Sequence, residues 1–238
     1  ERRKLFGIWQ PIVEDLQRRT GLRLNLVTSL SVGEYERDVR QGNFDFVYMN
    51  PYLVLQVAAT PGYVPLVRDQ RPLRGILVVR KDSPYQKVED LQGKTIAVPS
   101  WTALGASLLL RAELDRTFRV RMRAIDAKTH SSVFLHVLND LADAGGAVQK
   151  TLAEQEPAVQ GALRVLHSTQ EVPSHPLAAH GRVPPVVRDK IRQAFIDMAS
   201  SEDGRRLLAE IPMQRPVPAT VEDYRPLQAL ALERYLQP

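Results

Sequence analysis

Hydroxyl, amide and aromatic side chains stand where predicted strands of this sequence end. The stretch PSWTALGAS passes from the strand 95–100 into a helix that we expect to begin near Thr102 and run to about Leu114. The first N–H groups of a helix have no partner within it, and its dipole adds about half a positive charge at that end. This helix start therefore predicts an anion-binding site to which Thr102 donates its hydroxyl, unless Thr102 serves only as the helix cap.

A second candidate site follows the predicted strand 44–49, which runs directly into Asn50-Pro51-Tyr52. Open α/β sheets place ligands at the carboxyl ends of their strands. Tyr48 and Tyr52 could wall a cleft there, and Asn50 could donate or accept a hydrogen bond. A purely structural aromatic pair is the alternative.

Strand-like and helix-like stretches alternate almost throughout, which predicts an α/β fold with largely parallel sheets. Helices are expected at 8–20, 31–40, 102–114, 131–138, 185–198, 202–208 and 221–235. Strands are expected at 22–28, 44–49, 75–83, 95–100, 120–125, around the LADAGGAV stretch, and at 163–166.

The composition excludes several classes of protein and of site. The 238 residues include no cysteine, which rules out disulfides and thiolate chemistry. The net charge is +5. Because the lysines and arginines are scattered along the chain, they favour a solvated surface over a nucleic-acid face. No apolar run is long enough to span a bilayer, and no nucleotide-binding, hydrolase or metalloprotease motif occurs. We therefore expect no catalysis, no metal and no cofactor.

Six sequence blocks, in order and over nearly the whole chain, resemble those of phosphate, phosphite and phosphonate ABC-transporter substrate-binding proteins. The blocks are YMNPY, LRGILVVRKDSP, VEDLQGKTIAVPS, KTHSSVFLHVLND, ADAGGAVQ and VPSHPLAAHGRVPP. The resemblance implies a type II periplasmic binding protein fold, in which two α/β lobes joined by a two-stranded hinge close on a ligand. Lobe 1 would comprise residues 1–80 and 175–238, and lobe 2 residues 81–174, with crossings at RKDS and VPSHP. Such a fold normally opens with a strand before its first helix.

The resemblance also implies a set of ligand-binding residues. His130 matches a histidine that the family places at a helix start, where protonation near its reference pKa of about 6.5 would strengthen anion binding; a surface histidine is the alternative. Arg74 could make a bidentate contact to an anion or be an exposed hinge residue. The full set is Tyr48, Asn50, Tyr52, Arg74, Ser100, Thr102, Ala103, His130, Ser131, Gln149 and His175.

Two departures from the family pattern bear on the ligand. Phosphonate binders carry a Ser-Thr-Ser-Gly run where this chain has Thr102 to Gly105, so backbone N–H groups would hold much of the anion. Acidic residues that bind the ammonium of aminophosphonates are replaced by Gln149 or Lys150 and by His175. A smaller or doubly anionic ligand is therefore favoured over an aminophosphonate.

The resemblance implies an extracytoplasmic protein that delivers a small anion to an ABC permease and contacts the membrane only through its partner or an anchor. The same module also occurs as the sensing domain of histidine kinases, which is the main alternative. A third possibility is an enzyme built on the same fold. No nucleic-acid partner is expected.

Overall fold

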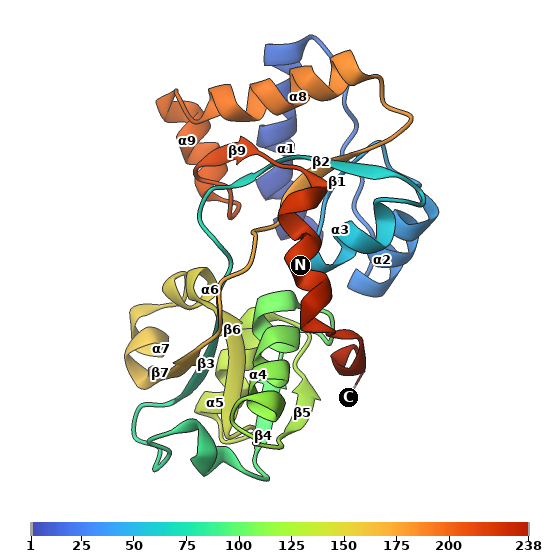
Figure 1. Cartoon of the computed structure of the whole chain (residues 1–238). Helices are drawn as coiled ribbons and strands as arrows, with labels where there is room; N and C mark the ends of the chain where they lie inside the picture. The colour runs from blue at the N-terminus through green and yellow to red at the C-terminus, as the bar shows by residue number, and fades with distance from the viewer. Residues whose placement is uncertain (1, 238) are drawn as a thin grey trace. The chain divides into compact units, whose positions relative to one another are not determined.

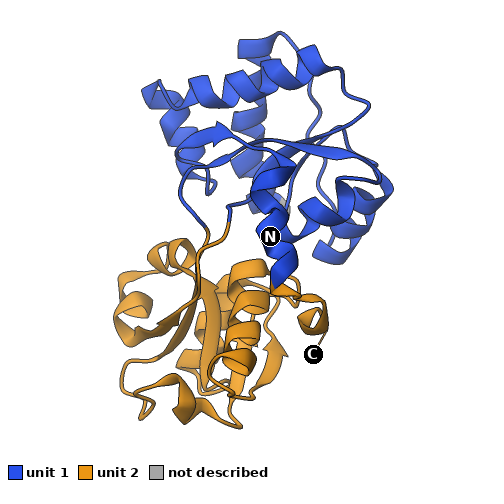
Figure 2. Cartoon of the chain, viewed as in Figure 1, with its two compact units in different colours: residues 1–72, 173–229 blue, residues 73–172, 230–238 orange. Residues whose placement is uncertain are grey.

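The computed structural model describes residues 2–237, which divide into two compact units (Figure 2). Unit 1 comprises Glu1–Pro72 and Pro173–Ala229, and unit 2 comprises Leu73–Val172 and Leu230–Pro238. The chain thus crosses between units near residues 72 and 172. The first crossing lies earlier than the predicted RKDS segment, whereas the second falls at the start of the predicted VPSHP segment. The first crossing is earlier because the strand beginning at Gly75 already belongs to the sheet of unit 2.

Unit 1 holds a four-stranded sheet in the order β1-β8-β2-β9 (Figure 1). Its strands are β1 (Phe46–Tyr48), β2 (Tyr63–Asp69), β8 (Pro176–His180) and β9 (Pro216–Pro218). Its helices are α1 (Arg2–Thr20), α2 (Val32–Gln41), α3 (Pro51–Val57), α8 (Pro185–Met198) and α9 (Glu202–Ala209). The 3-10 segment η3 (Val221–Leu230) follows β9 and leads into unit 2.

The pairings recorded in the unit 1 sheet are all antiparallel, which corrects the expectation of largely parallel sheets. The cause is β8, which returns from unit 2 and inserts between β1 and β2 in the opposite direction. The sequence pattern predicted a proline-flanked crossing at VPSHP and no strand after it. β8 is instead a buried central strand, with Ala178 and Ala179 inaccessible to solvent.

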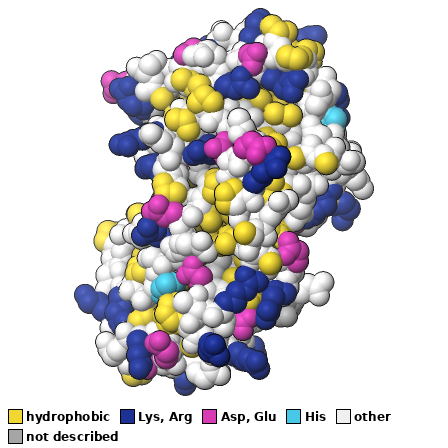
Figure 3. All heavy atoms as spheres, in the orientation of Figure 1, with side chains coloured by type: hydrophobic (Ala, Val, Ile, Leu, Met, Phe, Trp, Pro, Cys, Tyr) yellow, Lys and Arg dark blue, Asp and Glu magenta, His cyan; other side chains and the backbone are white. Residues whose placement is uncertain are grey.

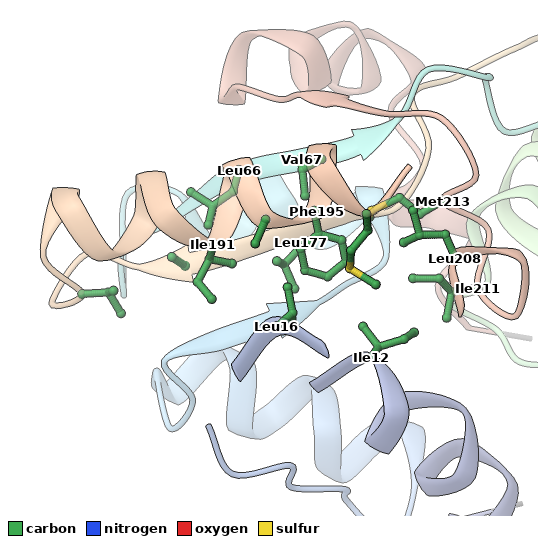
Figure 4. Packing of buried hydrophobic residues seen from close by; sticks show 14 residues of the cluster. Ile12, Leu16, Leu66, Val67, Leu177, Ile191, Phe195, Leu208, Ile211 and Met213 are labelled. Carbon is green, nitrogen blue, oxygen red and sulfur yellow. The ribbon is translucent and has the colours of Figure 1, made fainter. Parts of the chain in front are cut away.

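The core of unit 1 lies between the sheet and helices α1, α8 and α9 (Figure 4). Ile12 and Leu16 enter it from α1, and Phe195 enters it from α8. They pack against sheet residues such as Leu66 and Leu177. Burial of these apolar side chains stabilises the helices that the periodic apolar pattern predicted here.

Unit 2 holds a five-stranded sheet in the order β5-β4-β6-β3-β7. Its strands are β3 (Gly75–Arg80), β4 (Thr95–Val98), β5 (Arg123–Asp126), β6 (Ala144–Val148) and β7 (Leu163–Ser168). Its helical segments are η1 (Val88–Leu91), η2 (Leu104–Leu109), α4 (Leu110–Arg116), α5 (His130–Leu138), α6 (Gln149–Ala153), α7 (Pro157–Ala162) and η4 (Glu233–Tyr235). β4 pairs in parallel with β5 and β6, whereas β3 is antiparallel to β6 and β7.

Helix η2 is a π-helix that continues directly into α4, and its backbone rests on the sheet through glycines. A Cβ atom added at Gly75 would lie 2.0 Å from the carbonyl oxygen of Gly105. One added at Gly146 would lie 2.0 Å from the carbonyl oxygen of Ala106. The glycines on β3 and β6 therefore fix how closely the start of this helix approaches the sheet.

The two crossing segments between the units run beside each other. Leu73 and Val172 form an antiparallel bridge in which each backbone N–H donates to the other carbonyl, at 2.8 and 3.0 Å. A third crossing follows residue 229, because the C-terminal residues pack on unit 2 rather than in the lobe 1 predicted for them. There Arg111 donates to the carbonyl of Tyr235 at 2.7 Å, and Arg116 donates to that of Ala231 at 2.6 Å.

The predicted strand 22–28 is absent: this segment is extended but pairs with no strand among the described residues, and Figure 1 draws it as a plain tube. Its alternation is real, since Leu22, Leu24 and Leu26 are half-buried while Arg23 and Asn25 are exposed. The segment lacks a neighbouring strand with which its backbone could form a ladder among the described residues.

The surface in view in Figure 3 carries lysines and arginines scattered over both units, as the sequence pattern predicted. No helix within residues 2–237 has the length and apolarity needed to cross a membrane.

Candidate functional site

In unit 2, chain segments with polar side chains leave three strands at one edge of the sheet. Because β4, β5 and β6 run parallel, their carboxyl ends share that edge. Ser100 and Thr102 follow β4, His130 follows β5 after a short turn, and Gln149 follows β6. Arg74 joins them from the antiparallel strand β3, because its neighbour Gly75 lies opposite Val148.

The helix that follows β4 begins at Leu104, two residues later than expected. Its cap residue is Ala103, whose carbonyl oxygen accepts from the N–H groups of Ser107 and Leu108 at 2.9 and 3.0 Å. Thr102 lies in the preceding turn, so it does not cap the helix, and the alternative in which it serves only as the cap is wrong. Ala103 has no side-chain acceptor. The first N–H groups of this helix therefore make no hydrogen bond to the side chain of their cap residue.

His130 is the first residue of α5, and Thr129 caps that helix by accepting from the N–H of Ser132 at 3.0 Å. The Nδ1 atom of His130 is buried and has no hydrogen-bond partner among the described residues. Burial lowers the pKa of His130 to about 4, so the imidazole is neutral near pH 7. This corrects the expectation of a pKa near 6.5. Ser131 follows it, exposed, in the same first turn.

Arg74 is engaged in an ion pair and does not stand alone at the sheet edge. Its Nη2 lies 2.5 Å from Oε1 of Glu171, and both side chains are about half exposed, at 49% and 52%. The pair neutralises the arginine charge and also engages the nearby carboxylate. Gln149, the first residue of α6, is exposed, whereas Ser100, Thr102 and Ala103 are half-buried.

Unit 1 brings together the remaining four predicted residues. Asn50 caps α3 by accepting from the N–H of Tyr52 at 3.0 Å. The ring of Tyr48, at the end of β1, stacks on His175 with 5.8 Å between ring centroids. Trp9 of α1 lies on Tyr48 as well, at 5.1 Å. These residues form an aromatic cluster at one end of the unit 1 sheet.

The hydroxyl of Tyr48 is a buried polar group with no partner among the described residues. Burial is the largest cause that raises the pKa of Tyr48 above its usual value, so the phenol stays protonated and can donate. A buried hydroxyl normally has a hydrogen-bond partner, because leaving it unpaired costs about 1–3 kcal/mol. Its exception needs an explanation.

A family model described as "ABC transporter, phosphonate, periplasmic substrate-binding protein" matches residues 1–224. The chain belongs to this family. Members of this family are periplasmic substrate-binding components of ABC transporters. The two α/β units of this phosphonate-family protein have the type II periplasmic binding protein fold.

Solved structures similar to this phosphonate-family protein share its fold at low sequence identity. A binding protein component of an ABC phosphonate transporter from Pseudomonas aeruginosa is 15% identical, with a TM-score of 0.85 over 99% of this chain and 84% of that chain. PhnD1 from Prochlorococcus marinus, in complex with methylphosphonate, is 12% identical, with a TM-score of 0.86 over 100% and 95%. XAC2383 from Xanthomonas citri, bound to ATP, is 19% identical, with a TM-score of 0.75 over 99% and 94%.

The sequence analysis did not single out two residues of this phosphonate-family protein that lie in the same contacts or elements as the candidate residues. Trp9 contacts Tyr48, but in the sequence it is one apolar position of a helix and gave no signal. The hydroxyl of Ser107 is fully buried in η2 and has no partner among the described residues. A serine within the apolar run LGASLLL was the signal that could have found it.

Residues 2–237 contain no group of three or more His, Cys, Asp or Glu side chains arranged to hold a metal ion.

Proposed function

We propose that this chain is a non-catalytic solute-binding protein that takes a small oxyanion of the phosphate, phosphite or phosphonate class and delivers it to an ABC permease. The observation that carries the proposal is a pair of buried, unpartnered polar atoms, the Tyr48 hydroxyl in unit 1 and Nδ1 of His130 in unit 2. A ligand with several acceptor oxygens can satisfy such groups.

The charge of the site favours an anion held mainly by neutral donors. The start of η2 supplies backbone N–H groups and the positive end of a helix dipole. His130 contributes a neutral ring, and Arg74 shares its charge with Glu171. With Glu171 engaged by Arg74, a ligand ammonium lacks a free carboxylate there, which disfavours aminophosphonates.

We propose that the ligand-binding groups of the chain are Tyr48 with Asn50 in unit 1, and Thr102 with His130 and the start of η2 in unit 2. Substrate-binding proteins of transporters need no nucleophile or acid–base pair. The neutral, buried His130 and the protonated Tyr48 suit donors to a ligand better than groups that exchange protons near pH 7.

Thermal unfolding in the presence of candidate anions tests the ligand class. Phosphate, phosphite or methylphosphonate at a hundredfold excess over Kd should stabilise the protein by about 2.7 kcal/mol and raise its melting temperature. Sulfate and 2-aminoethylphosphonate serve as comparison ligands. If none of the three phosphorus oxyanions raises the melting temperature while a sugar or a cation does, the anion proposal fails.

The family description favours the importer over the sensor domain of a histidine kinase. The full-length gene distinguishes them. A transmembrane segment and kinase domain encoded after Pro238 would overturn the importer assignment, and their absence would overturn the sensor assignment.

A further inference from the structure

Arg111 links the turn that leads into η2 to the last described residues of unit 2. It is the second residue of α4, the helix that continues η2. Its guanidinium lies over the ring of Trp101, with 5.4 Å from the central guanidinium carbon to the ring centroid. Trp101 stands between Ser100 and Thr102, two of the candidate ligand-binding residues. Arg111 thus contacts the turn that carries both of them.

Two backbone carbonyls hold this guanidinium in place. Its Nη1 donates to the carbonyl of Tyr235 at 2.7 Å, and its Nη2 donates to the carbonyl of Gln237 at 2.6 Å. Both carbonyls belong to the segment 230–237, which Figure 2 colours with unit 2. Burial lowers the pKa of Arg111, yet a guanidinium stays charged near pH 7 and needs acceptors of this kind. With both Nη atoms fixed, the planar group presents one defined face to the indole ring.

The segment 230–237 is itself fastened to α4 by further contacts. The side chain of Tyr235 is buried, and its hydroxyl donates to the carboxylate of Asp115 at 2.6 Å. Arg116 donates to the carbonyl of Ala231 at 2.6 Å, and its guanidinium lies 5.2 Å from the centroid of the Tyr235 ring. The carbonyls that receive the guanidinium of the neighbouring arginine are therefore held on the helix by contacts of their own.

We propose that Arg111 is a positioning residue for anion binding. It fixes the ring of Trp101, and the ring fixes the turn 100–103 that leads into the N–H groups at the start of η2. Without this contact the turn would have to be ordered when the ligand binds, which lowers affinity. The effect on affinity rests on the proposed function, whereas the contacts lie wholly within unit 2.

Fluorine NMR of protein labelled with fluorotryptophan tests the contact without any ligand. The chain has two tryptophans, so Trp101 gives one signal and Trp9, in unit 1, gives the other as an internal reference. Arg111→Met should shift and broaden the Trp101 signal and leave the Trp9 signal unchanged. An unchanged Trp101 signal would overturn the positioning role.

A double-substitution cycle with methylphosphonate as the probe tests the effect on affinity. Arg111→Met and Trp101→Leu should each weaken binding by about tenfold. The doubly substituted protein should lose no more than about tenfold, because Arg111 acts through Trp101. A loss of roughly a hundredfold would show that the two side chains act separately and would overturn the proposal. A wild type that binds no methylphosphonate, phosphate or phosphite would contradict the proposed function, and the NMR comparison would still decide the contact.

Arg116→Met is the matched control on the same helix. Arg116 also donates to two carbonyls of the segment 230–237, but it lies over Tyr235 and not over Trp101. Its replacement should leave the Trp101 signal unchanged and the affinity within about twofold. Binding as weak as that of Arg111→Met would overturn the assignment to Arg111.

Arg111→Lys separates positioning from charge, and it carries the test if Arg111→Met fails to fold. Lysine keeps the positive charge but lacks the planar fork that serves two carbonyls and a ring together. It should therefore show a shifted Trp101 signal and about tenfold weaker binding as well. Full wild-type affinity in Arg111→Lys would show that charge alone aids binding and would overturn the positioning role.

Discussion

Replacing Tyr48, whose hydroxyl has no partner among the described residues, should not lower the stability of the unliganded protein but should weaken anion binding. Tyr48→Phe removes a buried polar group that has no partner, so the unliganded protein should be unchanged or more stable by about 1 kcal/mol. The same change should weaken anion binding by about tenfold, because a donor to the ligand is lost. Urea unfolding and calorimetry measure the two effects.

Tyr63 provides the matched control for Tyr48→Phe within the same unit. Its hydroxyl donates to the carbonyl of Phe44 at 2.8 Å, so Tyr63→Phe should cost about 1 kcal/mol of stability. Anion affinity should not change. A Tyr48→Phe variant that is destabilised as much as Tyr63→Phe would show that the Tyr48 hydroxyl has a structural partner instead.

His130 should make stability depend on pH in the mildly acidic range. Its pKa is about 4 in the folded protein and about 6.5 when unfolded, so the unfolded state binds more protons between these values. Stability should therefore fall as the pH drops from 6.5 to 4, by up to about 3 kcal/mol from this residue. Unfolding free energies measured across that range in the wild type and His130→Gln isolate the contribution.

His130→Gln should flatten the acid loss of stability, since glutamine does not titrate, while other groups keep their own contributions in both proteins. Identical pH dependence in the two proteins would mean that His130 is already exposed to water when folded.

At the scale of elements, the glycine contacts beneath η2 should control both stability and the position of the helix start. Gly146→Ala places a Cβ atom 2.0 Å from the Ala106 carbonyl oxygen, so backbone must shift at a cost of about 2 kcal/mol or more. Anion affinity should fall too, because the N–H groups of the helix start move. Chemical unfolding and calorimetry check both effects.

Gly161→Ala is the control in the same unit, since a Cβ atom there meets nothing within 4 Å. It should be neutral or slightly stabilising, as expected for alanine in a helix. If Gly146→Ala is tolerated equally well, the close helix contact does not constrain the site.

The elements that the sequence predicted well are those fixed by local signals. Helix α2 begins after its cap Ser31 and ends at Gly42 in the left-handed conformation, as the pattern indicated. The predictions failed where the structure depends on contacts between residues far apart in the sequence. Segment 22–28 has the right alternation but no paired neighbour, and the proline-flanked β8 became a central strand through pairing on both sides.

The candidate site could likewise be predicted only in part. Its residues could be chosen from strand ends and family blocks, and the structure gathers them at one edge of each sheet. The burial of His130, the ion pair of Arg74 with Glu171 and the π-helical start at Leu104 depend on tertiary neighbours. No local pattern carries that information.

At the scale of the whole molecule, the central claim is that the chain binds a small oxyanion and that Tyr48 and His130 both contribute to its affinity. Calorimetric titration with methylphosphonate of the wild type, Tyr48→Phe and His130→Gln tests it most directly. We predict one-to-one binding by the wild type and a loss of about tenfold or more in each variant, although the substitutions lie in different units. Wild-type protein that binds no methylphosphonate, phosphate or phosphite, or variants that both retain full affinity, would contradict the account.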